Sequence, residues 1–408
     1  MSGDQVTVVV AGAEFGGWKS VRIEAGIEQQ ARSFKLETTS VWPGRADIPR
    51  RVRAGDPAQV FIGSDLVATG WVDATPVRYG KDAVTVGIHG RSKTADLVDC
   101  CPIQSLALGA GDAAGGHWAD VIPPGGASAP PAPATRVQAP ASSAGPHQWR
   151  GQRLEVIAAA LAAPYGVVVR VESTTGAPIA VHQLQPGETV FESIDRMMRL
   201  RHVLSTDNAH GDLVFIRPGS AGDADTALML GENILEADAP LDYKDVFSQY
   251  IVQGQRAGTD SAFGDVSTEV QAADGDALIA ASAAVAGASR RRVLVLKQSG
   301  QVDIGTAQDR AKYERAHRAA KALQTGYTVQ GWRQGSGALW VPNQYVHVRD
   351  ALVGFNARML VAKVAYLLDP QRGRVAELTV GPVDGYRTQA QKKAAATGDG
   401  GGNWKDVQ

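Results

Sequence analysis

The sequence predicts an α+β fold that is mainly β: two similar small antiparallel β-barrel domains plus an inserted α+β module. Short runs of alternating apolar and polar residues dominate both ends of the chain, and Gly, Pro and Asp residues separate them at hairpin spacing. Two stretches with helical periodicity lie together between these ends. At 408 residues the chain exceeds the size at which a single hydrophobic core usually keeps growing, so several domains are expected.

Residues 1–96 form the first expected barrel. Alternating runs begin with VTVVV at Val6 and continue through SFKLETTS to DAVTVGIHG, with no helical stretch between them. Several short strands without helices favour a small antiparallel barrel. We expect its core or rim to contain Trp18, Val21, Ile23, Phe34, Leu36, Phe61, Trp71 and Val86.

Residues 97–149 change in composition and are predicted to be a flexible loop. The part from 109 to 148 consists mostly of Gly, Ala, Pro and Ser, which cannot bury enough apolar surface to offset the entropy of ordering. Cys100 and Cys101 precede it. A bridge between adjacent cysteines is strained, and no pair of histidines lies near to complete a zinc site, so two reduced thiols and no metal are expected.

Residues 150–219 are expected to form the small α+β module. Leu154, Ile157, Ala158 and Leu161 share one helical face, and the pattern ends at Pro164 and Gly166. A second helix should begin at a capping box made by Thr189 and Glu192, with Phe191, Ile194 and Met198 on its apolar face. The polar turn NAHG then joins two strands in a hairpin.

Residues 220–386 are expected to form the second barrel domain, with one helix. The helix lies in TAQDRAKYERAHRAAKALQTG, with a Glu314 to Arg318 pair at i,i+4 and Gly326 as its stop. Its apolar stripe would contain Tyr313, Ala316, Ala320 and Leu323. Residues 257–289 are predicted to be a mobile excursion between strands, and 387–408 a flexible tail.

The two barrel regions resemble each other. The segment from Pro57 and the segment from Pro342 both begin Pro-x-Gln, and each continues as strand, Asp-containing turn, strand, polar turn and third strand. Two unrelated β-meanders would also look alike at this level of detail. If the duplication is real, three copies of the chain would present six similar barrels around one axis.

Composition restricts the possible partners. Lys plus Arg (41) nearly balances Asp plus Glu (42), so no field of one sign favours nucleic acid or an anionic membrane. No apolar run approaches the roughly 20 residues of a bilayer span. The N-terminus carries an acid and has no long apolar segment of the signal-peptide kind, so the protein is expected to stay in the cytoplasm where it is made.

One cluster of residues could carry chemistry. His202, Asp207, His210 and Asp212 fall within a short stretch, and carboxylates with imidazoles can ligate zinc or act as acid and base. However, Asp207 and Asp212 flank the predicted turn, where Asp and Asn serve local backbone hydrogen bonding. A peptidoglycan-degrading enzyme is the alternative from another class, but no pair of acids stands out for it. We assign no catalytic residue, metal or cofactor, and predict that the protein is not an enzyme.

Candidate interface residues come from basic and aromatic positions. Arg45, Arg50, Arg51 and Arg53 form the densest basic cluster, which favours a solvated edge or a protein interface over a phosphate site. Trp332 and Trp340 are core residues or interface anchors, and Trp404 in the tail has no local core. The predicted interface set is therefore Arg50, Arg51, Trp332, Trp340 and Trp404.

Several segments, in order, resemble the baseplate hub proteins of Mu-like contractile phages. They include VTVVVAGAEFGGWKSVRIEAG, SKTADLVDC, PGETVFESIDRMMRL and GYTVQGWRQGSGALWVPNQYVHVRD, and the resemblance extends from about Val6 to Tyr386. It implies a homotrimeric ring of pseudo-sixfold symmetry in the tail baseplate of the virion, between a hexameric tail tube protein and a trimeric central spike protein. Baseplate wedge or tape-measure proteins would be further partners.

Two alternatives to a phage hub remain. The hub portion of a secretion-system spike would carry a β-helical needle, and no such repetitive region follows Tyr386. A carbohydrate-binding protein would have in solution the mass of one chain, 42.9 kDa.

Overall fold

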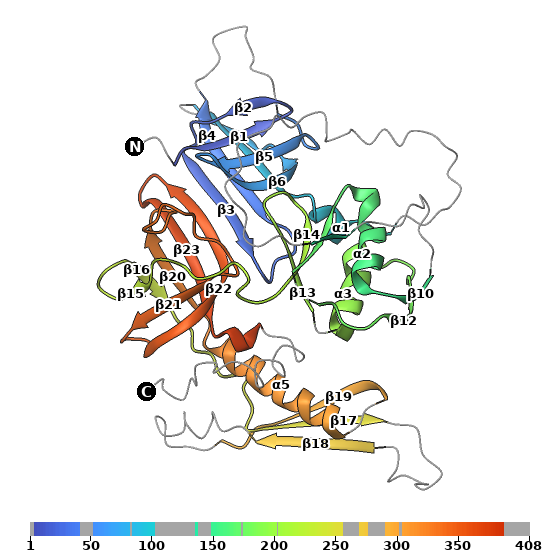
Figure 1. Ribbon diagram of the computed structural model, residues 1–408. Helices are drawn as coiled ribbons and strands as arrows, with labels where there is room; N and C mark the ends of the chain where they lie inside the picture. Colours follow the sequence, from blue (N-terminus) through green and yellow to red (C-terminus); the bar gives the residue numbers. More distant parts are fainter. Residues whose placement is uncertain are drawn as a thin grey trace, which may run out of the picture. The chain divides into compact units, whose positions relative to one another are not determined.

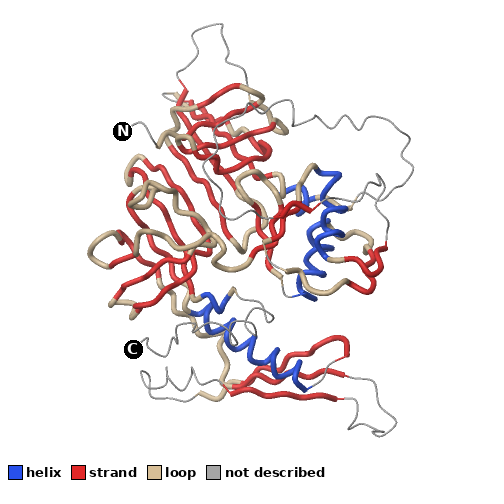
Figure 2. The backbone as a smooth tube through the Cα atoms, viewed as in Figure 1, coloured by secondary structure: helices blue, strands red, loops and turns tan. Residues whose placement is uncertain are grey.

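The computed structural model describes residues 4–40, 52–81, 84–102, 135–137, 148–172, 174–201, 203–255, 269–275, 290–301 and 304–386. The chain divides into two compact units. Unit 1 comprises Met1–Glu236, Thr328–Val346 and Val361–Leu378, and unit 2 comprises Ala237–Tyr327, His347–Leu360 and Thr379–Gln408. Strands dominate the described residues, and helices are confined to a few places (Figure 2).

The N-terminal strands, blue in Figure 1, form an antiparallel sheet. Its strand order is β3-β4-β8-β6-β5-β1-β2. β7 pairs with β8 beside the end of β6. Period-two alternation explains why these runs are strands, because every second side chain of β1 and β5 is buried. The strands are β1 (Val6–Val10), β2 (Ala13–Phe15), β3 (Ser20–Gly26), β4 (Ser33–Ser40), β5 (Pro57–Ile62), β6 (Asp65–Ala74), β7 (Val77–Tyr79) and β8 (Val84–Ser92).

The predicted core residues of this sheet fall into two groups. Val21, Ile23, Phe34 and Leu36 are fully buried, whereas Trp18, Phe61, Trp71 and Val86 are partly exposed at its rim. The mainly β, antiparallel class predicted from the sequence is confirmed. Among the described strands, however, the pairings follow an open path from edge to edge, and closure into a barrel is not seen.

The α+β module has the predicted helices. α2 (Leu154–Ala162) ends in a 3-10 turn (Ala163–Tyr165), and Gly166 follows in the left-handed conformation at φ 65°. At the start of α3 (Val190–Arg201) the predicted capping box is present: Glu192 N donates to Thr189 Oγ1 (3.1 Å), and Thr189 N donates to Glu192 Oε2 (2.8 Å). With α1 (Ala95–Asp99), these helices bury one apolar cluster that includes Leu97, Ile157 and Ile194.

Short strands complete the module. β13 (Leu204–Asp207) and β14 (Leu213–Ile216) form the predicted hairpin, and β14 also pairs in parallel with β11 (Val169–Val171). β10 (Gln148–Gln152) pairs with β12 (Ile179–Gln183). β9 (Thr135–Val137) pairs with β11, although it lies inside the segment expected to be a loop. The Gly- and Pro-rich residues 103–134 and 138–147 lie outside the described residues.

The C-terminal strands repeat the connectivity of the N-terminal ones. In chain order, β1, β3, β4, β5, β6 and β8 pair as β3-β4-β8-β6-β5-β1. In the same chain order, β15, β16, β20, β21, β22 and β23 pair as β16-β20-β23-β22-β21-β15, so every pairing has a counterpart. We call these sets repeat one and repeat two. The strands of repeat two are β15 (Leu228–Met229), β16 (Ile234–Asp238), β20 (Thr325–Gln330), β21 (Tyr345–Asp350), β22 (Phe355–Asp369) and β23 (Gly373–Gly381), followed by a 3-10 turn at Val383–Gly385.

Burial patterns support the equivalence of the repeats. The same order of four buried, one intermediate and one buried residue occurs at 67–72 of β6 and 359–364 of β22. A second shared pattern occurs at 87–92 of β8 and 375–380 of β23. The two Pro-x-Gln motifs also occupy equivalent places: Gln59 lies opposite Thr69 of β6, and Val361 of β22, the counterpart of Thr69, donates its N–H to Gln344 O at 2.8 Å. Strand order, burial and this motif therefore all support the duplication.

In unit 2, a three-stranded sheet packs against one helix. β17 (Gln249–Gln255) is central, antiparallel to β18 (Glu269–Gly275) and parallel to β19 (Val293–Gln301). α5 (Ile304–Ala322) lies along β17 and β18 (Figure 1) and buries Ala307 and Ala311. Within α5, Glu314 pairs with Arg318 at 3.2 Å as predicted, and with Arg310 at 2.6 Å.

Two predictions in this region were wrong. The helix ends at Ala322, and Gly326 lies within β20 instead of stopping the helix, because the chain turns into a strand at Thr325. The stretch 257–289, expected to be an excursion, contains β18, whose backbone is paired along its whole length with β17. Residues 256–268 and 276–289 lie outside the described part of the chain.

Candidate assembly surfaces and relatives

A sheet joint connects the two repeats within unit 1. β22 pairs antiparallel with β3, with Lys363 to Leu368 opposite Gly26 to Val21. Ion pairs reinforce it: Lys363 Nζ lies 3.0 Å from Glu24 Oε2, and Arg22 Nη1 lies 3.6 Å from Glu377 Oε2. Because this joint is a ladder of main-chain hydrogen bonds flanked by charge pairs, it is a stiff connection rather than a hinge.

The charges at this joint affect Glu24. Burial raises the pKa of its carboxyl group, but the hydrogen bonds from Lys363 and Arg22 lower it by more, so the pKa lies below its usual value. Glu24 is therefore ionised at neutral pH.

A second joint holds the module to repeat one. Asp207, at the end of β13, is buried and accepts from Arg32 N (2.8 Å) and Arg32 Nε (3.1 Å). The same guanidinium donates to Val67 O at 2.9 Å, and Thr206 Oγ1 donates to Gly26 O at 2.7 Å. These bonds connect β13 to β3, to β6 and to the turn before β4, so the module is fixed to the sheet by polar contacts at several points.

The residues predicted as a chemical cluster have structural partners. Asp207 is bound by Arg32, and Asp212 Oδ2 accepts from Arg170 Nε at 2.5 Å and from Asn208 Nδ2 at 3.1 Å. His210 is exposed in the turn, and His202 lies outside the described residues. Within the described part of the chain, no group of three or more His, Cys, Asp or Glu side chains is placed to hold a metal ion.

The predicted interface tryptophans lie in the core of unit 1. Trp332 and Trp340 are 0% and 2% exposed, and Trp332 Nε1 donates to the carbonyls of Leu367 (3.0 Å) and Val375 (3.1 Å). This is the core role that the sequence had left open. Arg50, Arg51 and Trp404 lie outside the described residues, so their interface role stays a prediction.

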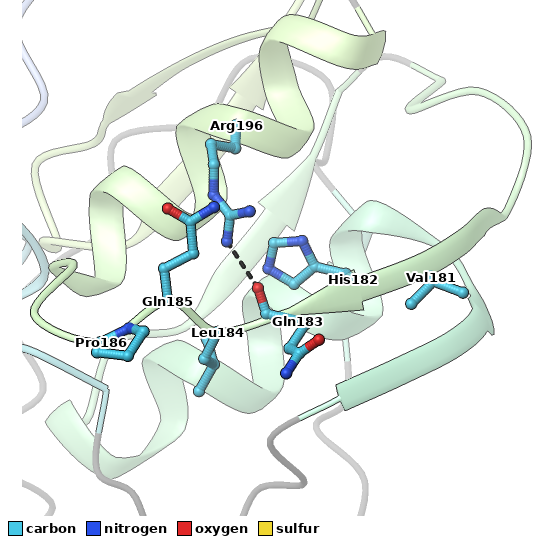
Figure 3. A pocket seen from close by; sticks show the side chains of 7 residues that line it. All are labelled: Val181, His182, Gln183, Leu184, Gln185, Pro186 and Arg196. Carbon is cyan, nitrogen blue, oxygen red and sulfur yellow. Dashed lines mark hydrogen bonds between the residues drawn. The ribbon is translucent and has the colours of Figure 1, made fainter. Parts of the chain in front are cut away.

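A shallow depression lies beside β12 and α3 in the module (Figure 3). Its lining includes His182, Gln183 and Arg196, and Arg196 Nη2 donates to Gln183 O at 2.8 Å. Burial, followed by the nearby Arg196 charge, lowers the pKa of His182. His182 Nε2 lies 2.8 Å from Ser193 Oγ, but Ser193 is fully buried. A hydroxyl without access to substrate cannot act as a nucleophile, so this pair orients the helix against the strand.

Sequence reasoning missed the arginines that organise unit 1. Arg333 Nε lies 2.6 Å from Asp4 Oδ1, and Arg333 Nη1 lies 2.8 Å from Asp65 Oδ2. Arg32 was missed in the same way. Their partners are tens to hundreds of residues away along the chain, and no local pattern marks such a pair.

The chain is 31% identical over 410 residues to the baseplate hub protein gp44 of Escherichia phage Mu, covering 97% of this chain and 93% of that protein. The chain belongs to the family of Mu-like baseplate hub proteins.

Sequence profiles of this family match three parts of the chain. They are the GpP-like N-terminal domain of the Mu phage baseplate assembly protein at residues 5–92, the second domain of gp44-like baseplate hub proteins at 140–217, and the fourth domain of GpP at 304–389. These matches span the sheet of repeat one, the module, and α5 with the C-terminal strands. No enzyme family is indicated by them.

Solved structures show the same fold. The 43 kDa tail protein of prophage MuSo2 from Shewanella oneidensis is 25% identical, with a TM-score of 0.73 over 94% of this chain and 100% of that one. The tail protein of Neisseria meningitidis MC58 is 20% identical, with a TM-score of 0.68 over 94% of this chain and 98% of that one. In the part of the chain that the structure describes, no helix has the length and apolar character needed to cross a bilayer.

Proposed function

We propose that three copies of this chain form a baseplate ring with approximate sixfold symmetry in a contractile phage tail. The ring would join the hexameric tail tube to the trimeric central spike, and wedge or tape-measure proteins would contact its periphery. The protein would be synthesised in the host cytoplasm and act in the virion. Its role would be to match symmetries through stiff interfaces, without catalysis.

One observation carries this proposal: the same six-strand connectivity occurs twice in the chain. A trimer of such a chain has six similar sheets, so it can offer near-equivalent docking surfaces to six tube subunits while remaining threefold elsewhere. The β22–β3 joint supports it, because a symmetry adaptor requires its two repeats to be held rigidly.

The experiment is a mass measurement combined with imaging. Light scattering on the purified chain, over a range of concentrations and with the spike protein added, should give three times the 42.9 kDa of one chain. Cryo-electron microscopy of the assembled particle should show six similar densities at the hub level. A dimer or monomer in the particle, or densities that differ between the two repeats, would contradict the proposal.

A further inference from the structure

The β22–β3 joint shows how repeat two attaches to repeat one. In the matched connectivity, β3 corresponds to β16, and β22 corresponds to β6 continued by β7. In the existing joint, β22 of repeat two pairs with β3 of repeat one. The equivalent joint with the two repeats exchanged would pair β6–β7 of repeat one with β16 of repeat two. Among the described strands, β16 is the last strand of the sheet, and β7 pairs only with β8. Both edges are therefore open where their counterparts are paired.

The register of this missing joint follows from the structure. Gly87 begins the burial pattern of β8 that Val375 begins in β23. Gly87 N donates to Pro76 O. Val72 lies opposite Gly90, so the two burial matches place Val364 opposite Leu378 and, three residues on, Leu367 opposite Val375. The carbonyls of Leu367 and Val375 both accept from Trp332 Nε1, which agrees with this placement. Pro76 thus corresponds to Leu367.

The preceding residues then match as well. Thr75 corresponds to Tyr366, which lies opposite Ile23 in the β22–β3 joint. The counterpart of Ile23 in β16 is Leu235, because Ile-Glu-Ala at 23–25 matches Leu-Glu-Ala at 235–237. Thr75 is therefore expected opposite Leu235, which brings Arg78 close to Glu232 in the turn just before β16.

Exposure distinguishes the open edges from their paired counterparts. Ile23 is 0% exposed in the joint, whereas Leu235 is 53% exposed. On the other edge, Val77 and Tyr79 are 58% and 76% exposed. Apolar side chains on an unpaired sheet edge are a template for pairing with another chain.

The charges and main-chain donors of the two edges are also compatible with pairing. Arg78 and Glu232 are both exposed and of opposite sign. Pro76 lacks an N–H, but its carbonyl faces Gly87 of β8, so the missing donor also lies on that side. The donors that point away from β8 belong to Thr75 and Val77 and are intact.

We propose that Asp73–Pro76 of one copy pairs antiparallel with β16 of a second copy of this chain, with β7 lying beside the turn before β16, and that this is the contact between subunits of the ring. The inference rests on the proposed ring. The contact is heterologous, because each subunit offers β7 on one side and β16 on another, and a repeated heterologous contact closes into a ring when the rotation allows. It would alternate with the β22–β3 joint around the axis, which gives six similar joints in a trimer.

A charge exchange tests the pairing in the full-length chain. Arg78→Glu and Glu232→Arg, made singly, should each weaken subunit association about tenfold, since attraction is replaced by repulsion. The double variant should recover association to within about threefold of the parent, because the opposite charges meet again. Sedimentation equilibrium measures this. Matched controls are Arg150→Glu on β10 and Glu14→Arg on β2, both exposed strand positions away from the two edges, which should associate like the parent.

A cysteine pair tests the register independently. In a background with Cys100→Ser and Cys101→Ser, Thr75→Cys with Leu235→Cys should give disulfide-linked ladders of up to three chains on oxidation. A variant that carries only one of these two cysteines should form disulfide-linked dimers at most. If the parent is a trimer but the charge exchange does not change its association and the cysteine pair gives no ladder, this interface is wrong and the proposed ring still stands. A parent that never associates, even with the spike protein, would overturn the ring and the interface together.

Discussion

At the scale of single residues, the most constrained group is the Arg32–Asp207 pair. The Asp207 side chain is 1% exposed and that of Arg32 is 15% exposed. Burying two charges costs several kcal/mol in desolvation, which is offset only when the geometry is good and the remaining donors are satisfied. Here the guanidinium also reaches Val67 O and Asp207 O, so each charge has several partners. The pair specifies where the module attaches to the sheet.

Removing one partner of this pair should therefore be costly. Asp207→Asn leaves the Arg32 charge buried without a counterion, and we expect a loss of about 3–5 kcal/mol in the free energy of unfolding, measured by urea denaturation. The control is Asp195→Asn, which breaks the ion pair with the 80% exposed Arg199 and should cost less than about 1 kcal/mol. Equal losses in both variants would show that Asp207 does not hold a buried charge.

At the scale of elements, two glycines allow β4, β6 and β8 to approach closely. A Cβ at Gly90 would lie 2.2 Å from Trp71 O and 2.3 Å from Phe34 Cζ, and a Cβ at Gly70 would lie 1.9 Å from Arg91 O. Gly70 lies opposite Ser92, and Val72 lies opposite Gly90, on the same pair of strands. The main chain itself fills the space that a side chain would need.

Gly90→Ala should accordingly destabilise the chain by about 1–3 kcal/mol, because the main chain of β6 and the Phe34 ring must both shift. Thermal unfolding followed by circular dichroism measures the change. Gly80→Ala is the matched control, since nothing lies within 4 Å of the added Cβ and its φ is ordinary. A neutral Gly90→Ala would mean that β4, β6 and β8 are less tightly packed than the structure indicates.

Elements with local signals could be predicted from the sequence, and those without could not. The α3 capping box and the stop of α2 at Gly166 depend on residues a few positions apart, and both were found as expected. β9 and β18 lie in Ala- and Gly-rich stretches without apolar alternation, and both exist through pairing with distant strands, β11 and β17. Tertiary pairing decided their structure, which no local pattern records.

At the scale of the whole molecule, the duplication was visible in the sequence only as a resemblance between two meanders. The strand pairings show that six strands of repeat one correspond to six strands of repeat two. They include the pair β1 and β15, which the resemblance between the two meanders does not cover. The candidate assembly edges followed only from that correspondence. Of the residues predicted at an interface, Trp332 and Trp340 are in the core. The size of a tryptophan side chain indicates that it makes a large contact, but it does not distinguish a core contact from an interface contact.

The duplication also identifies where the chain has been extended. β3 and β4 are joined by the short turn 27–32, whereas their counterparts β16 and β20 are joined by 239–324, which contain β17, β18, β19 and α5. The short connection in repeat one shows that this pairing needs no intervening domain. The three-stranded sheet and α5 have their own buried cluster, as expected for an element inserted at a hairpin turn.

Replacing 239–324 with the six residues Ile27–Arg32 should therefore leave the six strands of repeat two paired. We expect the shortened chain to unfold cooperatively and to keep the buried environment of Trp332. The reason is that Trp332 and the two carbonyls that accept from its indole N–H, those of Leu367 and Val375, all lie outside the replaced segment. Tryptophan fluorescence during urea unfolding and hydrogen exchange of β22 and β23 measure this. The control replaces 208–212, the β13–β14 turn that contains Gly211 at φ 73°, with the same six residues, which should disturb the Asp207 joint and lower stability more. Loss of protection in β22 of the shortened chain would show that the inserted segment is required by repeat two rather than added to it.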